Sequence, residues 1–359
     1  MRVPHYAKQP LAVLALAALM AGCGGDSTAP DAPFDPAGTS LDIGAMEASF
    51  ESPAMAGFGS AAGAIGAVLG ESPAAAAVRA VPTKALVTRG RPGARHYAAT
   101  VASAYVRPTG GMRPVAGSAA ILEEHLGVTF AYNTETDAYE ASELTGAPGD
   151  GVRFLVYAVD PITSVPVEPL VEVGYADITA SETATSMAVR VELVSGGVTY
   201  LDYSVGANAG TNAATVSISG FVTNGDDRVN FDLDTHITLD EESITLTLDY
   251  TLIVPTRNGF RIDFEAEATE ATVTSTLEAR GPHGTVTITG NQTSTTGSFE
   301  VEVNGELFAT VTTTAGQSPV ITGADGGALT EQELEALGGL INLFINGFDF
   351  FGDLLYPLP

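Results

Sequence analysis

Three scarcities in this chain exclude whole classes of function. Its 359 residues include one cysteine, no tryptophan, and 15 lysines and arginines against 43 acidic residues, for a formal net charge of −28. A single cysteine excludes a disulfide framework, a thiolate zinc site and a CxxC redox pair within the chain. Nucleic acid is excluded as a partner because phosphate binding requires clustered basic residues. The length predicts one or two domains, and with 45% hydrophobic and 16% charged residues the chain is too apolar to be a disordered acidic chain.

Catalytic motifs are also absent from the sequence. It contains no GxSxG, HExxH, P-loop or GxGxxG motif, and the four histidines after residue 22 form no metal-spaced pair. The run Glu123–His125 contains acid, base and metal-ligand side chains, but adjacent residues on one element point apart. The acidic turn 224–227 is a weak calcium candidate. We therefore predict that the protein is not an enzyme and has no catalytic residue, cofactor or metal site.

The most specific signal lies in residues 1–23. A weakly basic start precedes the apolar run Leu11–Met20, which is too short to span a bilayer and is typical of a secretory signal peptide. The run ends in Leu-Met-Ala-Gly-Cys, with the cysteine at position 23. This ending resembles the lipobox of bacterial lipoproteins, although methionine at its second position is less usual. The alternative is an ordinary signal peptide cut near Ala21, with a leftover cysteine.

The lipobox resemblance implies that residues 1–22 are removed and that Cys23 becomes a lipidated N-terminus. Several acyl chains on one residue anchor a protein stably, so the implied partner is a membrane. The implied location is the bacterial cell envelope, and specifically the outer membrane, because Gly24 and not an aspartate follows the cysteine. The resemblance extends over about the first 30 residues, and we recognise no family for the rest of the chain.

Between the lipobox and the first strands we expect a tether and then a helical or irregular segment. Residues 23–40 are rich in glycine, proline, alanine and aspartate, which predicts a flexible tether. Residues 41–127 follow, with helical periodicity over 41–70 that Pro53 interrupts. The uncharged half Ala54–Gly70 is either a packed helix or a membrane-associated one, and its alanine and glycine content favours packing.

The stretch 79–113 reverses the charge of the chain. It contains seven basic residues and no acidic one, whereas residues 114–359 contain six basic residues in all. One interpretation is a contact with anionic headgroups or a polyanion. The other, which the wide spacing of the arginines favours, is that the stretch packs beside the acidic remainder of its own chain.

From 128 to 314 the hydrophobic period becomes two, which indicates strands with one apolar and one polar face. We predict a mainly β fold: a large antiparallel meander of about 12–14 strands, forming a curled sheet or an open barrel. On its polar face His236 alternates with Asp232, Asp234 and Asp240. A surface metal site is the alternative there to plain solvated carboxylates.

Turn chemistry predicts the pairing of the later strands. Three-residue loops are expected at Arg257–Gly259 and Val303–Gly305. The expected partners are Leu239 with Ile244, Val254 with Ile262, Phe264 with Leu277, Leu277 with Val286, Ile288 with Phe299, and Val301 with Leu307.

The last segment, 315–359, is predicted to be a capping helix and tail. Thr330 and Glu333 form a capping-box pattern, and apolar residues then recur at helical spacing from Leu334. This helix, together with the helical segment near residue 41, is expected to cover the apolar face of the sheet.

These features predict a membrane-anchored envelope lipoprotein with a non-catalytic structural or interaction role, and Cys23 is its one predicted site residue. An alternative is a periplasmic carrier of a lipid or other apolar ligand, held between a curled sheet and a helical lid. A carboxylate-dependent hydrolase is a third and weaker hypothesis, because no pair of acidic residues stands out. Partners are accordingly the membrane, an apolar ligand or another envelope protein.

Overall fold

A computed structural model describes residues 34–68, 121–183, 186–239, 244–269, 271–293, 295–314 and 320–340. All of them belong to one compact unit that begins at Pro33. The lipobox with Cys23, the basic stretch 79–113 and residues 341–359 lie outside the described residues.

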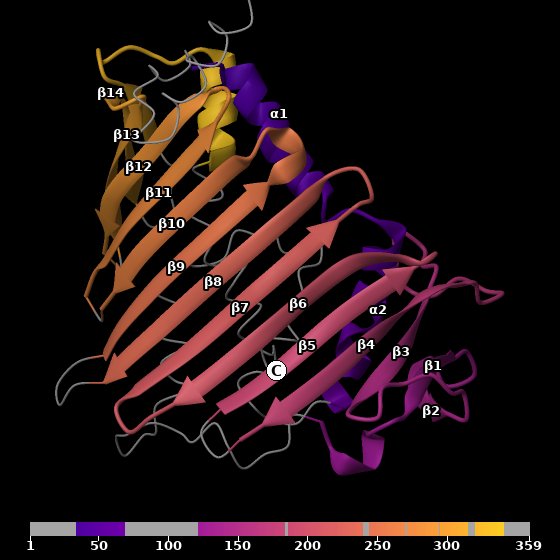
Figure 1. Ribbon diagram of the computed structural model, residues 1–359. Helices are drawn as coiled ribbons and strands as arrows, with labels where there is room; N and C mark the ends of the chain where they lie inside the picture. Colours follow the sequence, from indigo (N-terminus) through magenta and orange to yellow (C-terminus); the bar gives the residue numbers. More distant parts are fainter. Residues whose placement is uncertain are drawn as a thin grey trace, which may run out of the picture. The chain divides into compact units, whose positions relative to one another are not determined.

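The described strands form one sheet of 15 strands in the order β15-β14-β13-β12-β11-β10-β9-β8-β7-β6-β5-β4-β3-β1-β2 (Figure 1). Neighbours are antiparallel except β1 and β3, which are parallel. The sheet is open, with β2 and β15 as its edges. The predicted mainly β meander is therefore confirmed, with slightly more strands than expected.

The strands are β1 Thr129–Asn133, β2 Ala138–Ser142, β3 Gly151–Tyr157, β4 Glu172–Glu182, β5 Ser186–Ser195, β6 Val198–Ala209, β7 Ala213–Thr223, β8 Arg228–Leu239, β9 Ile244–Val254, β10 Phe260–Ala268, β11 Val273–Gly281, β12 Gly284–Gln292, β13 Thr296–Val303, β14 Glu306–Thr314 and β15 Val320–Gly323.

One face of the sheet carries the apolar residues of successive strands, as the two-residue period predicts. In β10, for example, Phe260, Ile262 and Phe264 are buried, whereas Arg261 and Glu265, which point to the other face, are exposed. The same alternation holds in β8, β9 and β13. Burial of these side chains is the main favourable term in the fold.

Pairing across individual hairpins was predicted only in part. Leu239 pairs with Ile244, and Phe264 with Leu277, as expected. Val254, however, pairs with Phe260 and not with Ile262. The reason is the loop, in which Pro255–Arg257 forms a 3-10 turn before Asn258 and Gly259 adopt left-handed conformations. A five-residue loop moves the register by two residues, which leaves every side chain on its predicted face.

The next two hairpins show the same two-residue difference. Leu277 pairs with Ile288, not with Val286, because the chain turns tightly between Gly281 and Gly284. Phe299 pairs with Gly290, not with Ile288. A Cβ atom on Gly290 would lie 2.5 Å from the Phe299 ring and 2.3 Å from the backbone oxygen of Ser298. The glycine therefore makes room for the aromatic ring.

The β13–β14 hairpin has a two-residue turn and not the predicted three-residue loop. Asn304 and Gly305 have φ values of 52° and 79°, as a type I′ turn requires. A bulge follows in β14, so that Val301 pairs with Ala309 and not with Leu307. Leu307 is consequently 50% exposed, whereas Ala309 is buried. The bulge restores the apolar face after the turn would have inverted it.

Two helices precede the sheet, α1 Pro36–Ala48 and α2 Pro53–Val68. Helix α1 begins within the stretch predicted as tether, because the Asp35 carboxylate accepts a hydrogen bond from the Gly38 N–H and Pro36 occupies the first turn. The break at Pro53 is as predicted. Helix α2 packs against β2–β6 and buries Phe58 and Ile65. None of the described helices is long and apolar enough to span a membrane.

The C-terminal helix, 331–340, starts at the predicted capping box. The Glu333 carboxylate accepts from the Thr330 N–H at 2.7 Å, and the Glu333 N–H donates to the Thr330 hydroxyl at 3.3 Å. Leu337 and Leu340 are fully buried, but Leu334, also predicted to face the core, is 42% exposed. A Cβ on Gly339 would lie 3.3 Å from Ile43, so this helix packs beside α1.

Two glycine-to-alanine substitutions should have opposite effects on stability. Gly290→Ala should lower the free energy of unfolding by about 1–3 kcal/mol, because the new methyl meets backbone and strands must separate. Gly44→Ala, in α1 with no atom within 4 Å of the new methyl, should raise it by about 0.5–1 kcal/mol through helix propensity. Urea denaturation followed by far-UV circular dichroism measures both; a loss of stability in both variants would contradict the assigned packing.

Candidate functional site

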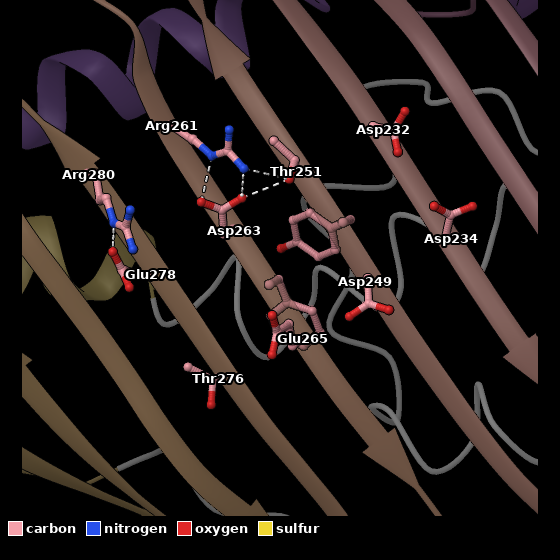
Figure 2. Close-up of a pocket in the computed structure, with 12 residues that line it drawn as sticks. Asp232, Asp234, Asp249, Thr251, Arg261, Asp263, Glu265, Thr276, Glu278 and Arg280 are labelled. Atoms are coloured by element: carbon pink, nitrogen blue, oxygen red, sulfur yellow. Dashed lines mark hydrogen bonds and ion pairs between the residues drawn. The ribbon is translucent and has the colours of Figure 1, made fainter. Parts of the chain in front are cut away.

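A shallow hollow of about 520 Å³ lies on the polar face of β8–β11 (Figure 2). Its side chains come from alternate positions on four neighbouring strands, so the sheet itself positions them. The acidic members are Asp232, Asp234, Asp249, Asp263, Glu265 and Glu278, and the basic members are Arg261 and Arg280.

The two arginines of the hollow are already engaged by carboxylates. Arg261 holds Asp263 through two hydrogen bonds of 2.6 Å, and the Thr251 hydroxyl donates to the same carboxylate at 2.7 Å. Arg280 pairs with Glu278. Burial alone would raise the pKa of Asp263, but the bonds from Arg261 and Thr251 outweigh it and lower the pKa. These cations are therefore not available to bind an anionic ligand.

The remaining carboxylates form a row across three strands. Asp234 lies directly opposite Asp249, and Asp249 lies directly opposite Glu265. Asp232 adjoins the row on β8, and its pKa is raised by burial and then by the charge of Asp234. Like charges directly opposite one another destabilise a sheet. The row can attract cations, but it is open to solvent and lacks the enclosure that a catalytic acid and base require.

The described members of the sequence-predicted clusters lie at or near the surface. Asp232, Asp234 and His236 are exposed, and Asp240 lies outside the described residues. Glu123–His125 forms a short 3-10 helix in which His125 contacts Glu124 at 3.8 Å and the edge of the Phe130 ring. Among the described residues, no three acidic, histidine or cysteine side chains are placed to hold a metal ion.

The acidic turn 224–227 has a structural role. The Asn224 amide donates to the Ala48 carbonyl at 3.1 Å, which ties the end of α1 to the β7–β8 turn. Asp227 pairs with Arg257 at 3.0 Å and accepts from the Thr256 hydroxyl at 2.7 Å. Hydrogen bonds within the chain thus already use the side-chain oxygen atoms of Asn224 and Asp227.

A cluster that the sequence did not reveal joins α1 to the β11–β12 turn. His283 lies between two carboxylates, with Nδ1 3.4 Å from Asp35 and Nε2 3.6 Å from Asp42. A Cβ atom on Gly38 would overlap the imidazole ring. Asp42 is 4% exposed, and burial raises its pKa although His283 and Arg257 partly oppose the shift. The Asp35-Pro36 pair marks the start of α1 in the sequence, but that pattern does not point to His283.

The chain matches no protein-family model, no curated protein and no solved structure. Any function must therefore be argued from the chemistry of its residues.

Relief of like-charge repulsion should stabilise the polar face. Asp249→Asn removes one charge from between Asp234 and Glu265 and should raise the free energy of unfolding by about 0.2–1 kcal/mol. Asp263→Asn, which loses the Arg261 pair, should lower it by a similar amount. Urea denaturation in 10 mM and 500 mM NaCl checks this, since salt should reduce both effects. A gain that salt leaves unchanged would contradict charge repulsion as its cause.

Asp42→Asn should stabilise the protein at pH 7 and not at pH 3. Because folding raises the pKa of Asp42, the stability that its proton contributes is present below the ordinary aspartate pKa and is lost as pH rises through the raised value. The neutral amide should therefore gain about 1 kcal/mol at pH 7. The control, Asp35→Asn, alters the exposed carboxylate and preserves helix capping. Denaturation curves from pH 3 to 8 test this; equal gains at both ends would refute it.

Proposed function

We propose that the protein is a lipid-anchored bacterial cell-envelope lipoprotein, held at the outer membrane, whose folded part has a non-catalytic structural or interaction role. The observation that carries this proposal is the single cysteine of the chain, placed directly after Leu-Met-Ala-Gly at the end of a signal-like apolar run. Stable membrane anchoring needs more than one acyl chain, and a lipidated N-terminal cysteine would carry several acyl chains.

The charge distribution of the described sheet supports an interaction role. All six arginines after residue 113 have partners within the chain: Arg153 with Asp177, Arg190 with Asp202, Arg228 with Asn230, Arg257 with Asp227, Arg261 with Asp263, and Arg280 with Glu278. The polar face therefore presents an excess of carboxylates. Such a face repels nucleic acid and other polyanions and opposes edge-to-edge association of copies.

The carrier function is the second candidate, and a specific observation favours it. The apolar face of the sheet contains a buried tyrosine hydroxyl, on Tyr203, that has no hydrogen-bond partner. A carried ligand with a hydrogen-bond acceptor would satisfy this group.

Anchoring is tested by replacing the cysteine. Cys23→Ala should move the protein from the membrane to the soluble fraction and remove the mass of the acyl chains from its N-terminal peptide. Ser27→Ala, four residues further along the tether, is the matched control and should remain in the membrane. Fractionation followed by mass spectrometry measures both; a Cys23→Ala protein that stays membrane-bound would refute the lipid anchor.

A further inference from the structure

Asparagine followed by glycine occurs at four places in the chain. Three of the pairs, at 224–225, 258–259 and 304–305, lie among the described residues, and the fourth, at 346–347, lies outside them. Such a pair is chemically labile because glycine has no side chain to keep its backbone nitrogen from attacking the asparagine side chain. The attack expels ammonia and ends in a carboxylate. The sequence alone does not distinguish the three described pairs, whereas their surroundings do.

Two of the pairs have the same backbone conformation. Asn258 and Gly259 have φ values of 53° and 74°, and Asn304 and Gly305 have φ values of 52° and 79°. Both asparagines lie in the left-handed region, which this residue type tolerates. Attack on the side chain requires each backbone to leave this conformation, and the matched angles give both pairs the same starting point. A difference in reactivity must therefore come from hydrogen bonds and exposure.

Hydrogen bonds hold the side chains of Asn304 and Asn224. The Thr285 backbone N–H donates to Asn304 Oδ1 at 2.9 Å, and the Asn304 backbone N–H donates to the Thr285 carbonyl at 2.8 Å. Asn224 Oδ1 accepts from the N–H groups of Asp226 and Asp227 at 3.0 and 2.8 Å, in addition to the bond from its amide to α1. Both side chains are partly buried. Neither can turn toward the next backbone nitrogen without breaking these bonds.

The side chain of Asn258, in contrast, is exposed and makes no hydrogen bond to any residue that the structure describes. Its loop is fastened just before it, because Thr256 and Arg257 both bond to Asp227. A Cβ atom on Gly259 would have no neighbour within 4 Å, so there is open space beside this residue. The Asn258 amide is therefore free to turn toward the Gly259 nitrogen.

We propose that Asn258 is a site of spontaneous deamidation with water as the only co-reactant. The Gly259 nitrogen loses its proton and attacks Cγ of Asn258. A C–N bond forms, the Cγ–Nδ2 bond breaks, and the side-chain nitrogen takes up a proton and leaves as ammonia. Water then opens the cyclic imide: opening at the side-chain carbonyl gives aspartate, and opening at the main-chain carbonyl gives isoaspartate. This modification is independent of the anchor and of the roles proposed above.

The two products affect the loop differently. Aspartate tolerates the left-handed conformation as asparagine does, so the loop keeps its shape and gains one negative charge. Isoaspartate carries the main chain through its side chain and adds a methylene group to the backbone. This lengthens the loop that pairs Val254 with Phe260. Because loop length sets the pairing of the two strands, isoaspartate should weaken the β9–β10 hairpin, whereas aspartate should not.

Labelling with oxygen-18 water tests the assignment. The full-length protein is incubated at pH 8 and 37 °C in this water, which labels each deamidated residue, and its peptides are then measured by mass spectrometry. Label at residue 258 should accumulate about three- to tenfold faster than at residue 304, the effect of one neutral hydrogen bond, and residue 224 should be slowest. In 6 M guanidinium chloride the three rates should converge, because unfolding breaks all of these bonds and each asparagine precedes a glycine.

Three outcomes would overturn the proposal. Equal rates in the folded protein, or faster labelling at 304 or 224 than at 258, would show that the hydrogen bonds do not set the order. A preference for residue 258 that persists in denaturant would show that the sequence and not the fold causes it. Labelling at residue 258 that is as fast at pH 6 as at pH 8 would contradict attack by a deprotonated Gly259 nitrogen.

An Asn258→Asp variant separates the two products. It carries the new charge without the added methylene group, and its melting temperature should match that of the fresh protein. Protein aged at pH 8 until residue 258 is converted should melt at a lower temperature, in proportion to its isoaspartate content. A variant that melts as low as the aged protein would overturn the effect assigned to isoaspartate.

Discussion

A wide sheet with all of its apolar side chains on one face is stable only if that face is kept from water. Fifteen strands contribute to it here, and the helices contribute buried residues against it, including Phe58 in α2 and Leu337 in the C-terminal helix. The placement of the described helices against the sheet follows from this requirement. Three helices begin at Pro36, at Pro53 and after Thr330, and their buried residues pack in the core on the apolar face of the sheet.

Electrostatic interactions determine how the side chains on the opposite, polar face are arranged. With few basic residues, the sheet pairs each described arginine locally and leaves many carboxylates in water. The row Asp234–Asp249–Glu265 follows from this excess, and repulsion between its carboxylates costs some stability. The hollow at this row is lined by carboxylates that could bind cations, but it is open to solvent, whereas a catalytic acid and base are usually enclosed. The two faces of the sheet therefore differ in character: one presents carboxylates to solvent, and the other contributes the buried apolar core.

Sequence periodicity predicted which face each side chain occupies but not always its partner across the strand. Val254, Leu277 and Phe299 each pair two residues away from the expected position, because loop length depends on local details such as Pro255. A two-residue shift preserves the face, so burial cannot distinguish the registers. Of the candidate polar residues, Glu123, Glu124, Asp232, Asp234 and His236 lie exposed on the surface, as predicted. The contact of His283 with Asp35 and Asp42 was not predicted, since about 240 residues separate α1 from that turn.

The sequence by itself determined what depends on near neighbours in the chain: the lipobox resemblance ending at Cys23, the alternation of the strands and the capping box at Thr330. Tertiary structure alone decided the register, the contact of His283 with Asp35 and Asp42, and the lack of a hydrogen-bond partner for the Tyr203 hydroxyl. Local patterns specify which face a residue occupies because side-chain direction alternates with each residue. Whether a buried hydroxyl finds a partner depends on atoms from distant strands, and only the folded chain brings those atoms together.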